Sequence, residues 1–166
     1  MVSYLYRMDE GYQGALTREP APGDVTQAAL DPSVTWSAQN FGIPVVYNGS
    51  GQATPVTSTT TASDVIGFLV RPFPGYAVSQ LSGQFPSIEA GVVDVARRGY
   101  MAVKLQNQTQ PVKGGKVYIR INNASTGLVI GGIEAASNND TIELTGATFE
   151  GAPDGNGIVE ISFSQF

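Results

Sequence analysis

The sequence predicts an all-β protein: a small β-barrel or sandwich of about eight or nine short strands with an extended N-terminal arm. Glycine (20 residues) and proline (10 residues) are frequent among the 166 residues, and only 14% of the residues are charged. Short apolar stretches alternate with turn sequences, and no long stretch has a helical period. We expect the sheet to close on itself or to pack on a second sheet, because an open sheet would leave its edges unpaired.

Residues 1–40 are predicted to form the arm, and residues 41–166 the β-barrel or sandwich domain. The first segment contains several prolines and has no sustained apolar period. One short helix is possible after Asp24, which would cap it, but two turns are marginal alone. The aromatic side chains of the arm should dock on this domain or on a neighbouring molecule, because exposed aromatics cost solubility. They are Tyr4, Tyr6, Tyr12 and Trp36.

The strands predicted in the β domain are short apolar stretches that end at turn residues. They span 43–47, 65–70, two strands within 91–105, 116–121, a hairpin strand within 128–135, 141–144, 147–151 and 158–163, and a further short strand is possible at 54–56. Asn48-Gly49 is a frequent hairpin turn. Pro72 ends the strand before it, because proline donates no backbone hydrogen bond to a sheet. No internal repeat at a fixed period is found.

Residues 116–121 alternate most clearly between apolar and polar side chains. Successive side chains of a strand point to opposite faces. We therefore expect Val117, Ile119 and Ile121 to face the core. The polar set is expected to face solvent and consists of Lys116, Tyr118 and Arg120.

The segment 71–90 is a long connection rich in proline and glycine. A loop of this length inside a compact domain is usually functional. Its aromatic side chains, Phe73, Tyr76 and Phe85, either pack beneath the loop or contact a partner. Proline-stiffened loops lose little entropy on docking, so these residues are candidate contact residues.

The absence of histidine and cysteine argues against an enzyme, because these side chains perform most nucleophilic and proton-transfer chemistry near neutral pH. A glycosidase needs only two carboxylates. The carboxylates considered for that role are Asp94, Glu134, Asp140, Glu143 and Glu160. Most of them are expected at outward strand positions or in turns, as solvated charges. The sequence therefore predicts no catalytic residue.

No cofactor and no bound metal are predicted. Residues 138–140 and 154–156 do cluster oxygen ligands of the kind that calcium prefers. Asn and Asp are also favoured in turns for backbone reasons alone, and neither stretch has the helix-flanked calcium loop. We expect turns at both places.

The charge of the chain argues against nucleic acid as a partner. The formal net charge is −5, and binding to phosphates needs clustered lysine and arginine. Arg97 and Arg98 are adjacent basic residues in a predicted tight turn and are secondary candidates for gripping a carboxylate or a phosphate. No apolar stretch is long enough to span a bilayer, so we predict no membrane partner.

The order of segments resembles that of the cement, or capsid decoration, proteins of tailed bacteriophages. The resemblance covers the chain from about Gly11 onward. The stretches that carry it are Phe41-Gly42-Ile43-Pro44, IGFLVRP (66–72), the hairpin 93–103 and GKVYI (115–119).

This resemblance implies a small β-barrel domain on the outer surface of the phage head. Such a protein would bind the major capsid protein, bridge neighbouring capsomers and associate with its own copies as a trimer or dimer. It carries over no catalytic residues. The alternative from another class is a carbohydrate-binding or receptor-binding module of a tail or fibre, which would use Trp36, Tyr76 and Tyr100.

Overall fold

The structure, a computed structural model, describes residues 11–36, 40–72, 91–106 and 109–164. These residues form ten strands in two antiparallel five-stranded sheets, which confirms the all-β prediction. The first sheet has the order β1-β5-β4-β2-β3 and contains β1 (Val25–Ala29), β2 (Pro44–Tyr47), β3 (Ala53–Pro55), β4 (Val65–Leu69) and β5 (Val92–Ala96). The second has the order β6-β10-β9-β7-β8 and contains β6 (Gly99–Lys104), β7 (Lys116–Arg120), β8 (Ile133–Glu134), β9 (Thr141–Phe149) and β10 (Ile158–Phe163). A short 3-10 turn, η2 (Ala62–Asp64), precedes β4.

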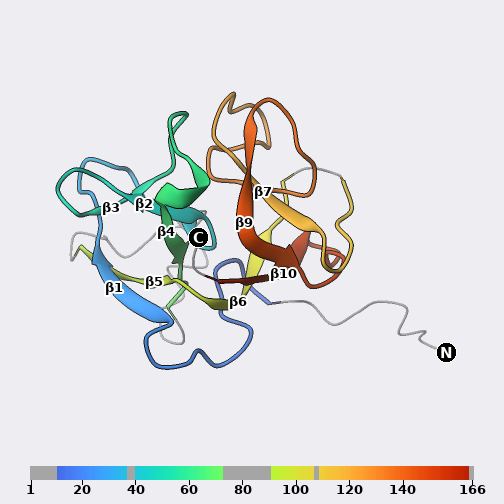
Figure 1. Ribbon diagram of the computed structural model, residues 1–166, viewed down its shortest axis with the longest axis horizontal. Helices are drawn as coiled ribbons and strands as arrows, with labels where there is room; N and C mark the ends of the chain where they lie inside the picture. The colour runs from blue at the N-terminus through green and yellow to red at the C-terminus, as the bar shows by residue number, and fades with distance from the viewer. Residues whose placement is uncertain (1–10, 37–39, 73–90, 107–108, 165–166) are drawn as a thin grey trace.

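The two sheets share one hydrophobic core, as in a sandwich. Figure 1 shows the strands of the first sheet on the left and those of the second sheet on the right. Apolar side chains of both sheets meet in a single buried cluster. Near its centre, the rings of Phe68 in β4 and Phe163 in β10 have centroids 4.7 Å apart. Burial of this shared surface is the main force holding the two sheets together.

Both sheets have the same topology. Numbered within its own sheet, each one runs in the order first, fifth, fourth, second, third strand. In each sheet, the residue after the first strand forms a parallel bridge with the third strand: Leu30 with Ala53, and Leu105 with Ile133. Each sheet therefore curls until its two edges approach each other. We call residues 25–96 the first module and residues 99–163 the second module.

The hydrogen bonds of the two modules correspond one to one at several places. Leu30 N–H donates to the carbonyl of Gly91 (2.6 Å), as Leu105 N–H does to that of Gly157 (2.9 Å). Further matching donor and acceptor pairs are Asp31–Ala53 with Gln106–Ile133, Gly42–Leu69 with Gly114–Phe149, Leu69–Ile43 with Phe149–Gly115, and Val70–Asp94 with Glu150–Glu160. The chain therefore contains a structural repeat.

The repeat extends to the core and to a short stretch of sequence. GVVDVA (91–96) and GIVEIS (157–162) occupy equivalent places at the fifth strand. Each module buries one residue from each of its five strands at matching positions, and the pairs are Ala28 and Val103, Val45 and Val117, Ala53 and Ile133, Leu69 and Phe149, and Val95 and Ile161. The sequence showed no repeat at a fixed period, because the connections differ in length between the two modules.

The prediction of a short helix after Asp24 is wrong, since these residues form strand β1. Val25 to Ala29 pair with β5 along their whole length. The backbone of β5 offers a full ladder of hydrogen bonds, whereas an isolated helix of two turns is unstable. Part of the segment that was expected to form the arm is thus an edge strand of the first sheet.

Residues 14–17 run along the free edge of β6. Gly14 N–H donates to the carbonyl of Ala102 (2.7 Å), Ala102 N–H donates to that of Ala15 (2.9 Å), and Leu16 forms an antiparallel bridge with Met101. This contact covers an edge that would otherwise be open to pairing with another chain.

Candidate contact surfaces

An open groove of about 780 Å³ lies at the Lys104 end of β6. Its walls come from the N-terminal residues 11–13, from Arg71 after β4, from residues 104–106, and from the connections that carry Val129 and Asn156. These segments are far apart in the sequence, so only the fold brings them together. We call this hollow the junction groove.

Arg71 fixes one wall of the junction groove. Its backbone N–H donates to the carbonyl of Gly14 (2.7 Å), and its Nε donates to that of Gln13 (2.9 Å). The guanidinium carbon lies 4.9 Å from the ring centroid of Phe41 and 5.8 Å from that of Tyr12. Burial lowers the pKa of Arg71, although arginine remains charged at any physiological pH.

Tyr12 is the predicted arm residue that lies at this groove. Its side chain is 71% exposed. Tyr4 and Tyr6 lie outside the described residues, as do Phe73, Tyr76 and Phe85 of the long loop. The described chain nevertheless shows where the segments that carry them begin. Gly11 and Arg71 both line the junction groove, so the N-terminal segment and the 71–90 connection join the domain at the same place.

Trp36, the remaining aromatic residue of the predicted arm, lies elsewhere. Its partly buried ring packs against the core of the first module. Its Nε1 donates to the carbonyl of Asp31 (3.0 Å). Part of the indole surface is thus used within this chain, as expected if the arm aromatics dock on their own domain.

Arg97 and Arg98 form the turn between β5 and β6, as predicted, and lie at the Gly99 end of β6. The side chain of Arg98 is 61% exposed, and its Nε lies 4.0 Å from a carboxylate oxygen of Asp24. Arg97 is partly buried, and its Nε has no hydrogen-bond partner among the described residues. The two candidate regions, the junction groove and this arginine pair, therefore lie at opposite ends of β6.

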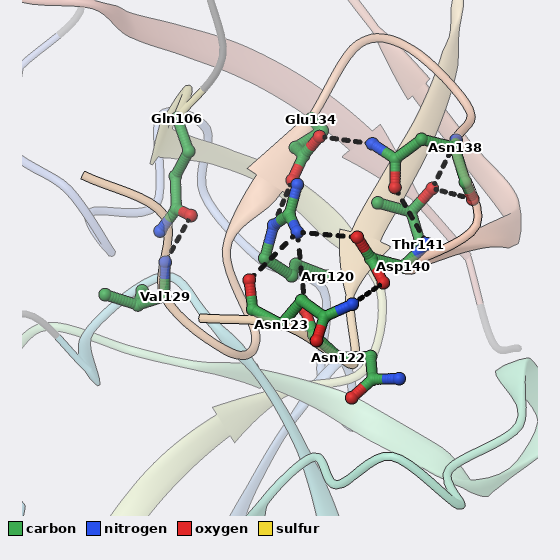
Figure 2. Close-up of polar contacts among 9 residues, drawn as sticks. All are labelled: Gln106, Arg120, Asn122, Asn123, Val129, Glu134, Asn138, Asp140 and Thr141. Carbon is green, nitrogen blue, oxygen red and sulfur yellow. Dashed lines mark hydrogen bonds and ion pairs between the residues drawn. The ribbon is translucent and has the colours of Figure 1, made fainter. Parts of the chain in front are cut away.

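Arg120 and Glu134 form a buried ion pair, which the sequence analysis missed. Both were expected to be solvated, but their side chains are only 6% and 1% exposed. Arg120 Nε donates to a Glu134 carboxylate oxygen at 2.6 Å, and its NH1 lies 3.5 Å from Asp140. The correct alternation of β7 does place Arg120 on the outer face. Residues of the connection between β7 and β9 surround Arg120 on that face (Figure 2), and both side chains of the pair are buried there.

The polar contacts around Arg120 hold this connection in place. Asn138 donates to the second carboxylate oxygen of Glu134 (3.1 Å), and Asn123 donates to Asp140 (Figure 2). The backbone N–H of Val129 donates to the side-chain oxygen of Gln106 (2.8 Å). This hydrogen bond holds the backbone of Val129 at the junction groove. The opposite charges of Arg120 and Glu134 on neighbouring strands could have indicated this pair. Recognising it required the register of the two strands, which the sequence does not show.

Other carboxylates considered for catalysis are engaged with cations on the outer face of the second sheet. Glu143 accepts from Lys116 (2.8 Å), and Glu160 accepts from Arg18 (3.3 Å). The Arg18 guanidinium also lies 3.5 Å from the centroid of the Tyr100 ring. A cation covers one face of Tyr100, which limits its use as a stacking surface for a sugar.

The two Asn and Asp clusters considered for calcium form turns. Asn138 accepts a hydrogen bond from the backbone N–H of Asp140 (2.9 Å), and Asp154 accepts from those of Asn156 and Ile158 (both 2.8 Å). Such side-chain contacts to the backbone are the usual reason for Asn and Asp in turns. Within residues 11–164, excluding the undescribed gaps, no group of three or more acidic side chains is arranged to hold a metal ion. In the same residues no helix is long and apolar enough to span a membrane.

Comparison with known proteins identifies the family. A model of the XM1 gp53 minor capsid protein family matches residues 1–163. The chain belongs to the XM1 gp53 minor capsid protein family. In a structure titled "The capsid of Myoviridae Phage XM1", one chain has the same fold, with a TM-score of 0.65 and 18% sequence identity. The similarity covers 99% of this chain and 96% of that one. Comparison with curated proteins gives no match.

Membership of the XM1 gp53 family assigns this protein a structural role at a phage capsid and places it in the virion. The expected resemblance to capsid-associated phage proteins is confirmed. The contacts proposed for the named residues stay predictions.

Proposed function

We propose that this minor capsid protein is a cement protein, which binds the outer surface of the phage head and joins neighbouring capsomers of the major capsid protein. Family membership supports a structural role at the capsid. The observation that carries the finer proposal is the placement of two candidate contact regions at opposite ends of β6, the junction groove and the Arg97–Arg98 turn. A molecule with contacts at both ends can hold two neighbours at once.

The two regions present different chemical groups, which is expected if they bind different surfaces of the capsid. The groove combines cations with the exposed ring of Tyr12. The turn presents Arg98, with most of its side chain in solvent. A strand of six residues separates them by roughly 17 Å, so the contacts do not overlap.

The aromatic residues outside the described ranges belong to the same proposal. Tyr4 and Tyr6 are covalently joined to the groove through Gly11, and Phe73, Tyr76 and Phe85 follow Arg71. A specific interface buries about 1,000 Å² or more. Segments that start at one place and carry aromatic side chains are suited to enlarge a contact there.

Association of this protein with its own copies, as a trimer or dimer, completes the proposal. A capsid presents the same site many times, and linking copies over such a lattice multiplies a modest affinity. The role requires contact surfaces and no chemical step.

Removal and re-addition of the protein test this function. Virions stripped of it should lose resistance to heat and osmotic shock, and the purified protein should restore both. Electron microscopy of restored heads should show its density outside the shell, bridging capsomers. Unchanged resistance after stripping, or density elsewhere in the particle, would rule out the cement function. Binding of the isolated protein to glycans, with no affinity for capsids, would instead support the receptor-binding alternative.

A further inference from the structure

The junction groove differs in charge from the rest of the chain. Most lysine and arginine side chains in the described ranges pair with a carboxylate, as Lys113 does with Glu150. Arg71 and Lys104 both line the groove, and neither lies within ion-pair distance of a carboxylate among the residues that the structure describes. The described lining also contains no Asp or Glu. In a chain of net charge −5, this is a local reversal of sign.

Apolar surface lies beside these two cations. Tyr12 is 71% exposed and Val129 is 41% exposed, and both line the groove. Lys104 Nζ donates a hydrogen bond to the backbone carbonyl of Asn156, which orients the ammonium group without neutralising it. The groove therefore presents positive charge and an exposed aromatic ring together.

One wall of the groove comes from chain that the repeated framework does not require. Arg71 lies near the start of the connection 70–91, which is much longer than its counterpart 150–157 in the second module. Val129 lies in the connection 121–132, whereas the equivalent hairpin of the first module is short. The two modules show that five strands fold with short connections at either place. The longer connection 121–132 thus adds a wall to the groove that the five-stranded module does not need, which indicates a role other than stability.

We propose that the junction groove binds an acidic peptide segment of the capsid partner, with carboxylates at Arg71 and Lys104 and an apolar side chain against Tyr12 and Val129. This inference rests on the cement function proposed above and names the chemistry that its groove end recognises. Charge complementarity supports the acidic part, since arginine and lysine pair with carboxylates in charge-assisted hydrogen bonds. The exposed aromatic ring supports the apolar part.

Two other anionic occupants fit the groove less well. A nucleic acid would require many phosphate contacts, and the described lining offers two cations. A free phosphate would leave Tyr12 and Val129 exposed. A peptide satisfies both the charges and the apolar surface.

The first test compares two lysines of equal charge in a binding assay that uses stripped capsids as the probe. Lys104→Gln should weaken binding of the labelled protein about tenfold, the loss of one charge-assisted contact. Lys113→Gln, which removes the same charge outside the groove, should change affinity less than about twofold. Raising the salt concentration should weaken the wild type more than Lys104→Gln.

The second test compares two exposed tyrosines in the same assay. Tyr12→Ala should weaken binding about tenfold, as expected if the partner covers part of this exposed ring in the complex. Tyr47→Ala is the control, because Tyr47 is 52% exposed on β2 and does not line the groove. A photo-crosslinking amino acid at position 12 should capture a capsid peptide that contains Asp or Glu.

The outcomes separate this inference from the cement function. Suppose that the wild type binds capsids and that neither Lys104→Gln nor Tyr12→Ala weakens binding more than its control variant does. This result would overturn the groove proposal and leave the cement function standing. No wild-type binding at all would overturn both. Capture of a peptide without carboxylates would also contradict the inference. If Lys104→Gln and the double variant Asp9→Asn/Glu10→Gln lowered thermal stability equally, the chain's own N-terminal acids would fill the groove, and the proposal would be wrong.

Discussion

Arg120 and Glu134 show how one pair of side chains can organise a long connection. A buried charge is costly unless it is paired and hydrogen-bonded, and both members here have several partners. Because the partners come from β7, β8 and the turn before β9, the pair fixes their relative positions.

Removal of Glu134 should therefore destabilise the protein strongly. We expect Glu134→Ala to lower the free energy of unfolding by about 3 kcal/mol, because it leaves a buried guanidinium without its main partner. Glu143→Ala is the matched control, since Glu143 pairs with the exposed Lys116, which lies on β7 as Arg120 does. This control variant should cost less than about 1 kcal/mol of unfolding free energy. Urea denaturation followed by the fluorescence of Trp36 measures both. Equal losses for the two variants would contradict the proposed role of the buried pair.

Asp31 gives a prediction for the pH dependence of stability. Hydrogen bonds from the hydroxyl and the backbone N–H of Ser33, and from Asn48, lower the pKa of Asp31. A carboxyl whose pKa is lower in the folded state stabilises the fold above its ordinary pKa, near 4, and loses this effect as the pH falls.

We therefore expect the urea midpoint of the wild type to fall between about pH 5 and about pH 3 by more than that of Asp31→Asn. Asp94→Asn serves as the control, because Asp94 is exposed and forms no hydrogen bond or ion pair through its side chain with the described residues. Asp94→Asn should show the same fall in urea midpoint as the wild type. A loss in Asp31→Asn as large as that of the wild type would refute this assignment.

At the level of the element, the segment 14–17 protects the edge of β6. Gly14 adopts a positive φ of 84°, and a Cβ added there would lie 2.5 Å from the Cβ of Phe41. Only glycine fits at this position, because the chain passes between β6 and the end of β4.

Gly14→Ala should displace this segment and expose the edge of β6. We expect a loss of about 3 kcal/mol, from left-handed backbone strain plus steric overlap, together with aggregation through the free edge. Gly23→Ala separates the two causes, because Gly23 has a similar φ of 91° but no atom within 4 Å of an added Cβ. It should cost about 1 kcal/mol. Urea denaturation and light scattering test both variants, and a Gly14→Ala protein that aggregates no more than the wild type would contradict the edge argument.

On the scale of the whole molecule, the chain is a duplicated five-stranded module with an asymmetric core. The first module encloses its own small apolar cluster, and the second shares its core with residues of the first such as Phe68 and Val70. The second module alone would therefore expose part of its core to water.

This asymmetry predicts a single unfolding transition for the chain. Urea curves from Trp36 fluorescence, which reports on the first module, and from circular dichroism should coincide. A fragment of residues 99–166 should remain unfolded on its own, because the apolar surface that covers it is missing. Two separate transitions, or a folded fragment, would show that the modules are independent.

Most strands were predictable, since short strands with turn residues between them have a local signature. The alternation predicted in 116–121 and the apolar run predicted in 65–70 correspond closely to β7 (Lys116–Arg120) and β4 (Val65–Leu69). The segment after Asp24 was not, because its pairing partner β5 lies more than sixty residues away. Arg120 was placed on the correct face of its strand, but its burial depends on a connection whose path no local pattern reveals.

The sequence by itself determined the all-β class, the turns, and the absence of histidine and cysteine, because these depend on neighbouring residues and on composition. The tertiary structure alone decided the repeat, the buried ion pair and the junction groove. Each of these rests on contacts between residues far apart in the chain, and the distance between such partners varies with the length of every connection. Long-range pairing is a property of the closed fold, and it leaves no periodic trace in one dimension.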